Sequence, residues 1–207
     1  MDLIAAATGA VDVLETLHRT ADLLDRLKRA LVKDPKRAAA ELGSVLDEIM
    51  KAPPAVNAAV AELIAIGRAR PLPADRLFAL ASSGLEAQVE GLRPHCHRID
   101  DVWRNSLSQW LPAAGVQGAD IDELQRLLRA LAHGDDDFFR YFTQLAVAVQ
   151  QAAWEAARRV HSGRDAAAAT MLQHLELPLL EASRKANELA VVVARLRTAF
   201  DLAARGG

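Results

Sequence analysis

The chain has 207 residues, of which 51% are hydrophobic and only 4% are aromatic, and its formal net charge at pH 7 is −2. Alanine and leucine are strong helix formers, whereas strands favour β-branched and aromatic residues, and no long stretch alternates with period two. The composition therefore predicts an all-α fold, built as a multi-helix bundle. A slightly acidic chain gives no global electrostatic case for nucleic acid as a partner.

The cysteine content and the first residues predict a cytoplasmic protein. Cys96 is the single cysteine, which excludes an intrachain disulfide framework and suits a reducing compartment. The chain starts with Met1 and Asp2, without the basic stretch of a secretory signal or the second-position glycine of a myristoylation motif. The uncharged stretch Tyr141–Trp154 is too short and too polar to span a bilayer.

The first predicted helix spans residues 2–32 and carries a heptad stripe, the pattern that holds one face of a long helix against its neighbours. Asp34 and Pro35 then supply an N-cap and a proline at the first helical position, so a second helix is expected over residues 35–51. The stripe consists of Leu3, Ala7, Ala10, Leu14, Leu17, Ala21, Leu24 and Leu31.

Five further helices are predicted between residues 53 and 163, each beginning near a proline or an acidic residue. The second of them, capped by Asp75, should be weak at residues 82–84, where the sequence is Ser-Ser-Gly. Residues 112–118 form the longest loop-like segment. We therefore divide the chain into an N-terminal helical bundle, 1–112, and C-terminal helices, 113–207, which pack on the same bundle as one continuous domain.

Two helix ends carry recognisable signals. Asp120 to Glu123 reads as a capping box at the start of a helix. His161 and Gly163 should end the next one, since a cation in the last turn followed by a glycine is the usual order.

The last helix carries the second long heptad stripe and, at about 1.5 Å per residue, would be roughly 55–60 Å long. Pro178 lies in this stripe and is expected to bend the helix without ending it, because the heptad continues in register. The first and last helices should therefore pack lengthwise as the spine of the fold. The stripe consists of Leu172, Leu175, Leu179, Ala182, Ala186, Leu189, Val193, Leu196, Phe200 and Ala203.

The densest group of potential metal ligands is His95, Cys96 and His97, with Asp100 and Asp101 one turn later. Helical phase separates them, because His95 and Cys96 share the apolar face while His97 and Asp101 lie on the solvent side. A zinc site needs three or four ligands that converge on one point. We therefore expect no metal here, with His95 and Cys96 facing the interior.

Weak signals of a cofactor site surround His18. Glu15 and His18 make one Glu-x-x-His unit of the di-iron bundles, which need a second copy. His18 also resembles the proximal histidine of heme oxygenases, but Glu86 and Ala87 stand where that family has distal glycines. The simpler interpretation is a histidine beside a helix seam, without a cofactor.

Arg126 and His133 have the Arg-x6-His spacing that HEPN-type ribonucleases use. His133 also precedes a glycine at a helix end, where it complements the helix dipole. A helical ligand- or metal-binding protein or enzyme, heme-oxygenase-like or HEPN-like, with His18 or His95 as its reactive group, is therefore the alternative interpretation.

Six basic residues surround the corner between the first two predicted helices. A local patch of this kind can contribute about 1 kcal/mol per residue near an anionic membrane. It is the candidate membrane or partner surface of the chain. The basic corner consists of Arg26, Lys28, Arg29, Lys33, Lys36 and Arg37.

The small, apolar start of the first helix, Leu3–Val11, is followed by the corner Lys33–Lys36 and the leucine-rich Glu41–Leu46. This order resembles HeLo and HeLo-like domains. The resemblance implies a helical module of cell-death or innate-immune proteins that oligomerises and engages membranes through its first helix. We therefore predict a non-enzymatic interaction and oligomerisation module without cofactors, whose partners are a protein or a second copy and an anionic membrane.

Overall fold

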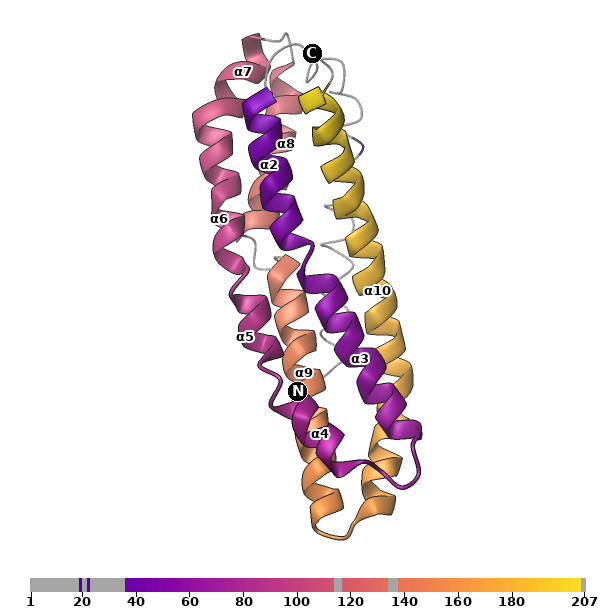
Figure 1. Ribbon diagram of the computed structural model, residues 1–207. Helices are drawn as coiled ribbons and strands as arrows, with labels where there is room; N and C mark the ends of the chain where they lie inside the picture. Colours follow the sequence, from indigo (N-terminus) through magenta and orange to yellow (C-terminus); the bar gives the residue numbers. More distant parts are fainter. Residues whose placement is uncertain (1–18, 20–21, 23–35, 114–116, 134–137, 206–207) are drawn as a thin grey trace. The chain divides into compact units, whose positions relative to one another are not determined.

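The computed structural model describes Arg19, Asp22 and residues 36–113, 117–133 and 138–205 (Figure 1). Nearly all of these residues are helical, and no strand occurs among them, which confirms the all-α prediction. Apart from Arg19 and Asp22, the helix predicted over residues 2–32 lies outside the described residues, and so does its packing against the last helix.

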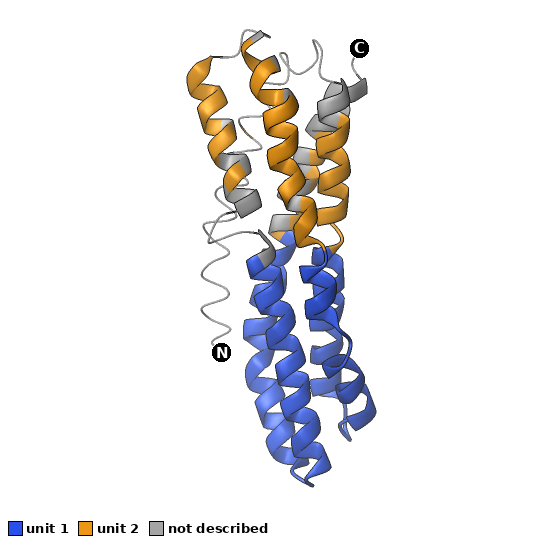
Figure 2. Cartoon of the chain, turned by 90° about the vertical axis from the view of Figure 1, so that its left-hand side faces the viewer, with its two compact units in different colours: residues 1–10, 52–91, 139–187 blue, residues 11–51, 92–138, 188–207 orange. Residues whose placement is uncertain are grey.

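The chain divides into two compact units, which Figure 2 distinguishes by colour. Each unit combines segments from both sides of residue 112, so neither is a continuous stretch of sequence. Unit 1 comprises residues 1–10, 52–91 and 139–187, and unit 2 comprises residues 11–51, 92–138 and 188–207.

Unit 1 is a four-column helical bundle in which the second column is made of two short helices. An aromatic ring of α4 contacts one of α9, and α3 contacts both short helices, so these neighbouring columns are joined. The columns are α3 (Ala52–Arg68), α4 (Ala74–Ala81) followed by α5 (Leu85–Glu90), α9 (Phe138–His161), and the first part of α10 (Asp165–Arg205).

The core of unit 1 joins the apolar faces of these four columns. The Tyr141 ring packs edge-on against Phe142, with ring centroids 5.3 Å apart, and its hydroxyl donates a 2.6 Å hydrogen bond to the Ala182 carbonyl of α10. A buried hydroxyl needs such a partner, so this bond also fixes α9 against α10. The largest buried side chains of unit 1 are Leu63, Ile66, Leu77 and Phe142.

Gly67 allows α3 and α10 to approach closely. A Cβ atom at this position would lie 3.1 Å from the Leu172 Cβ, which is tighter than an ordinary van der Waals contact. Because that Cβ is attached directly to the α10 backbone, a larger residue at position 67 would push the two helices apart.

The weak point predicted at residues 82–84 is a break between two helices. Gly84 adopts a left-handed φ of +68° there, a conformation that favours glycine. The prediction that Asp75 caps the helix is wrong. The N-cap is Pro73, in extended conformation and without a side-chain cap, so Asp75 lies inside the first turn.

The predicted end of α9 at His161 and Gly163 is confirmed. Gly163 has a φ of +70°, its N–H donates to the Val160 carbonyl, and the Arg164 N–H donates to the Arg159 carbonyl. These are the two bonds of a Schellman motif, which satisfies the last carbonyls of a helix. The chain then reverses within three residues and starts α10 at Asp165.

Pro178 lies inside α10 and does not end it, as the heptad pattern predicted. In unit 1, four residues of the predicted stripe are buried and Leu175 is half-buried. The remainder of the stripe, from Leu189 onward, lies outside the part of the chain whose side chains are described. The buried members are Leu172, Leu179, Ala182 and Ala186.

Unit 2 contains the predicted second helix and the helix that begins near Pro94, which confirms both. The Asp47 carboxylate of α2 accepts two hydrogen bonds, of 2.8 and 3.0 Å, from Arg197 of α10, and these bonds lower the pKa of Asp47. The elements are α2 (Lys36–Ile49), α6 (Arg93–Val102), the π-helical η1 (Trp103–Leu107), α7 (Ser108–Ala113), α8 (Gly118–His133) and the last part of α10.

The core of unit 2 and the start of α8 can be compared with the predictions. The large apolar residues of α6, η1 and α7 are buried wherever their side chains are described, namely Ile99, Val102, Trp103, Leu107 and Leu111. The capping box predicted at Asp120 is wrong, because α8 begins at Gly118 and places Asp120 inside the first turn.

One stretch of the described chain, Ala40–Arg68, is long and apolar enough to cross a membrane by length and composition. It is not one uninterrupted helix, since α2 ends at Ile49 and α3 begins at Ala52. In its most apolar window 44% of the residues are buried within the protein. The core helices of folded bundles have the same composition, so this stretch gives only weak evidence for a membrane.

Replacing Phe142 by alanine should destabilise the protein far more than replacing Trp154 by alanine. Phe142 is fully buried, and deleting such a ring leaves a cavity that costs about 3–5 kcal/mol. Trp154 is 56% exposed, so its loss should cost about 1 kcal/mol. Urea unfolding followed by circular dichroism measures both free energies. Equal losses would contradict the orientation of α9.

Candidate functional site

The face of α10 opposite its buried stripe carries two exposed leucines. Leu177 is 77% exposed and Leu180 is 44% exposed, although leucine usually lies inside. They belong to a series of exposed residues spaced alternately four and three apart, the spacing of a coiled-coil seam. We call this series the outward α10 stripe; it consists of Ala166, Thr170, Gln173, Leu177, Leu180 and Arg184.

Polar contacts with α3 hold α10 in this rotation. Asn57 Nδ2 donates a 2.6 Å hydrogen bond to Asn187 Oδ1, and Ser183 Oγ donates a 2.9 Å bond to Asn57 Oδ1. One turn from the leucines, Arg68 of α3 forms an ion pair with Glu176, which lowers the pKa of that carboxyl. These contacts with α3 therefore hold α10 in one orientation, in which the outward α10 stripe faces solvent.

A second exposed apolar feature is an aromatic pair between α4 and α9. Phe78 and Trp154 meet edge to face, with ring centroids 5.8 Å apart and planes at 73°. Gln150 secures the end of α4 beside them, because its Nε2 donates to the Ala81 carbonyl and its Oε1 accepts from the Glu86 N–H.

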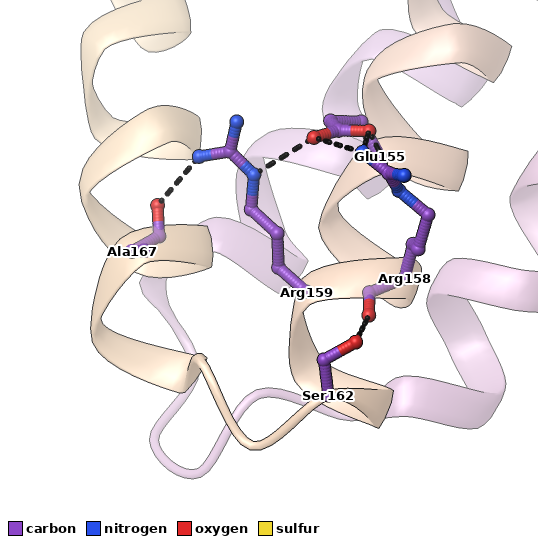
Figure 3. A network of polar contacts seen from close by, with 5 residues as sticks. All are labelled: Glu155, Arg158, Arg159, Ser162 and Ala167. Atoms are coloured by element: carbon purple, nitrogen blue, oxygen red, sulfur yellow. Dashed lines mark hydrogen bonds and ion pairs between the residues drawn. The ribbon is translucent and has the colours of Figure 1, made fainter.

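Three arginines line a hollow of about 520 Å³ where α9 reverses into α10. Figure 3 shows two of them, Arg158 and Arg159. Two of them come from the last turns of α9, and the third follows Gly163 in the connection. We call it the arginine hollow; its lining consists of Glu155, Arg158, Arg159, Ser162, Arg164 and Ala167.

Glu155 organises two of these arginines. Its carboxylate accepts hydrogen bonds of 3.1 Å from Nε and Nη2 of Arg158, and one of 3.0 Å from Nε of Arg159. Arg159 Nη1 also donates a 3.3 Å bond across the turn to the Ala167 carbonyl (Figure 3). The bonds from Arg158, and then those from Arg159, lower the pKa of Glu155.

A second, more open hollow of about 550 Å³ lies next to the first along α10. Arg159 and Ala167 line both hollows, so the two hollows adjoin at these residues. Its surface is mainly apolar, in contrast with the arginine hollow. We call it the apolar hollow; its other lining residues are Ala166, Thr170, Met171, His174 and Leu175.

The basic corner predicted from the sequence cannot be placed. Arg26, Lys28, Arg29 and Lys33 lie outside the described residues. Lys36 and Arg37 begin α2, but their side chains are not described either. The basic corner therefore stays a prediction.

The histidines near the start of α6 fit their predicted orientation in part. His97 is exposed, as predicted. His95 is half-buried, with Nδ1 inside and without a hydrogen-bond partner, while Nε2 lies 4.0 Å from Glu48 Oε2. The side chain of Cys96 lies outside the described part. Among the described residues, no group of three or more His, Cys, Asp or Glu side chains is arranged to hold a metal ion.

The residues of the alternative enzyme interpretation are not brought together in the described part of the chain. Glu15 and His18 lie outside it, and His133 is within α8 but its side chain is not described. Arg126 forms hydrogen bonds of 3.1 and 2.7 Å with Glu123, one turn earlier on the same helix. The HEPN-like spacing is therefore not tested.

The sequence analysis missed both the outward α10 stripe and the arginine hollow. The signal for the hollow was present as Arg158 and Arg159 just before Gly163, with Arg164 after it. The signal for the stripe was a second heptad phase through Leu177 and Leu180. The prediction used the first phase alone, because that phase accounts for the buried face of the helix.

Substituting Arg158 by glutamine should raise the pKa of Glu155 toward its ordinary value. The bonds from Arg158 are the largest cause of the lowered pKa, and they favour the charged carboxylate. A lowered carboxyl pKa stabilises the fold above the unfolded-state pKa, and this contribution is lost as the pH falls. NMR titration of the Glu155 side-chain carboxyl carbon measures the pKa. An unchanged value in Arg158→Gln would contradict the geometry of Figure 3.

Comparison with known proteins gives no match to a family model, to a curated protein or to a solved structure. The resemblance of residues 3–46 to HeLo-like domains therefore stays a prediction, as does the heme-oxygenase-like or HEPN-like alternative. A function for this chain has to be argued from the geometry of its own residues.

Proposed function

We propose that this chain is a non-enzymatic helical interaction module that associates with a second copy through the outward α10 stripe. The observation that carries the proposal is the exposure of Leu177 and Leu180, one turn apart, at heptad spacing. Single exposed leucines are common on protein surfaces, but a spaced pair on a fixed helix is the pattern of a helix-packing seam.

The stripe is complementary to itself when two copies pack antiparallel. A two-fold axis between positions 177 and 180 sets Leu177 of one copy against Leu180 of the other, twice. The same register sets Gln173 against Arg184, whose guanidinium can donate to the glutamine carbonyl. An apolar centre with a polar rim is the usual anatomy of a protein interface.

The charges beside the leucines are compatible with this contact. Glu181 and Arg184 form an exposed ion pair on α10, with Arg184 Nη2 2.7 Å from Glu181 Oε1. Hydrogen bonding from Arg184 lowers the pKa of Glu181, so the carboxylate stays charged and paired at neutral pH. Neither charge would therefore be buried unpaired at the edge of the seam.

The size of the stripe sets the expected affinity. One helix face about five turns long offers less area than the roughly 1,200 Å² of a standard stable interface. We therefore expect a weak dimer, with a dissociation constant in the range of about 10 μM to 1 mM. Such a contact suits a module that assembles when it is concentrated locally.

The membrane part of the proposal rests on the sequence. The basic corner, Arg26 to Arg37, and the HeLo-like resemblance of the first helix support an anionic membrane as a further partner. Assembly at such a surface would raise the local concentration and so favour the weak α10 contact. This combination is the oligomerising behaviour that the resemblance implies for defence or cell-death modules.

Replacing both leucines should abolish self-association. Sedimentation velocity over about 10 μM to 1 mM should show reversible dimers of the unaltered protein and only monomers of Leu177→Ser/Leu180→Ser. Gln151→Ser, an exposed change on α9, should leave the dimer intact. A monomer throughout this range, or a dimer that survives the double substitution, would rule out the outward α10 stripe as the interface.

Reversing three charges of the basic corner should remove binding to anionic vesicles. Arg29→Glu/Lys33→Glu/Lys36→Glu should no longer sediment with them, and added salt should weaken binding of the unaltered protein by screening. If the unaltered protein never sediments with such vesicles, even at concentrations at which it dimerises, the membrane part of the proposal fails.

A further inference from the structure

We infer that the arginine hollow and the apolar hollow together bind one amphiphilic molecule that carries a phosphate group. The phosphate would lie against the three guanidinium groups, and the apolar part would lie along Met171 and Leu175. This inference goes beyond the proposed self-association and does not depend on it. The two contacts would share Ala166 and Thr170, which belong both to the apolar hollow and to the outward α10 stripe.

The charge of the arginine hollow favours an anion. Its lining has three guanidinium groups and one carboxylate, a net formal charge of +2. Asp165, next in sequence to Arg164, offsets part of this charge, and the exposed His161 would add to it when protonated. Within the described part of the chain, the guanidinium of Arg164 makes no hydrogen bond or ion pair.

Glu155 holds two of the guanidinium groups in place before any ligand arrives. The Arg158 bonds to Glu155 use Nε and Nη2, and the Arg159 bonds to Glu155 and Ala167 use Nε and Nη1. Nη1 of Arg158 and Nη2 of Arg159 therefore keep their donors for a ligand. Ordering these long side chains in advance lowers the entropy cost of binding.

Phosphate suits these donors better than a carboxylate does. A phosphate monoester carries a charge of about −1.5 to −2 at neutral pH and three acceptor oxygens, enough for three guanidinium groups. Arginine binds phosphate through paired N–H donors, which gives short, charge-assisted hydrogen bonds.

The neighbouring hollow accounts for the apolar part of the ligand. Arg159 and Ala167 belong to both linings, so a ligand whose phosphate binds Arg159 can place its apolar part against the lining that includes Met171 and Leu175. Each hollow, of about 520 and 550 Å³, has the size of an ordinary small-molecule site. A bare anion would leave the apolar surface uncovered, whereas an alkyl phosphate would cover it.

Titration with inorganic phosphate and with hexyl phosphate, followed by NMR, tests this inference. At constant ionic strength, the Nε–H signals of Arg158, Arg159 and Arg164 should shift saturably with both compounds. The Met171 methyl signal should shift with hexyl phosphate alone, and the Met50 methyl, in unit 2, with neither. Hexyl phosphate should bind at least about tenfold more tightly, because its chain is removed from water.

Three substitutions separate the two halves of the site. Arg164→Gln should weaken both compounds about five- to tenfold, because a charge-assisted hydrogen bond is lost. Met171→Ser should weaken hexyl phosphate alone. Arg126→Gln is the control, since Arg126 is paired with a glutamate one turn earlier as Arg158 is, but lines neither hollow.

Vesicles distinguish a lipid headgroup from a soluble phosphate compound. If vesicles of phosphatidylcholine with phosphatidic acid bind the protein, and Arg164→Gln weakens that binding, the ligand is a lipid. If hexyl phosphate binds but these vesicles do not, or Arg164→Gln does not affect vesicle binding, the ligand is soluble. The inference is overturned if phosphate causes no saturable shift, if hexyl phosphate binds no more tightly than phosphate, or if Arg126→Gln has the same effect as Arg164→Gln.

Discussion

The rotation of α10 about its own axis determines which residues of unit 1 face solvent. Leu172 fits against Gly67 of α3, where a Cβ on the glycine would come within 3.1 Å, and the Tyr141 hydroxyl of α9 bonds to the Ala182 carbonyl. These contacts lie on two flanks of one helix and are separated by almost three turns. Together they leave α10 a single rotation, because each residue turns the helix by about 100°.

The exposure of the leucines follows from that rotation. Alanines at positions 168, 182 and 186 are fully buried and allow α10 to lie close to its neighbours. Leu177 and Leu180 lie on the opposite side of the helix, although they are larger than these alanines. Packing within the chain alone would favour burying the leucines. A helix that buries Leu172 and Leu179 on one face and exposes two further leucines on the other is the arrangement expected of a helix with a second partner.

The turn between α9 and α10 forms the arginine hollow. The Schellman motif at Gly163 reverses the chain so tightly that Arg159 meets the first turn of α10. The hydrogen bond from Arg159 to the Ala167 carbonyl spans this reversal. The site therefore needs no residue from outside one helical hairpin, although its apolar part shares Ala166 and Thr170 with the outward α10 stripe.

Periodicity and helix-end signals predicted much of this fold, since they reflect local physical rules. The heptad through Leu172 and Leu179 predicted the buried face of α10. Because the heptad continues past Pro178, it also predicted correctly that this proline does not end the helix. The capping signals at Asp75 and Asp120 failed, because the helices there start earlier and place the acidic residues inside the first turn instead of at the N-cap. The arginine hollow was not predicted, because Arg158, Arg159 and Arg164 match no known motif, and they line one hollow only once the turn at Gly163 is formed.

The most direct test of the central claim is the distance between two copies measured with a spin label on α10. In Ala166→Cys/Cys96→Ser, labelled at position 166 and studied at a concentration where dimers form, double electron–electron resonance reports that distance. An antiparallel seam centred between Leu177 and Leu180 predicts about 37 Å along the helix axis. A distance below about 15 Å, as in a parallel pair, or no dipolar signal between copies, would contradict the account.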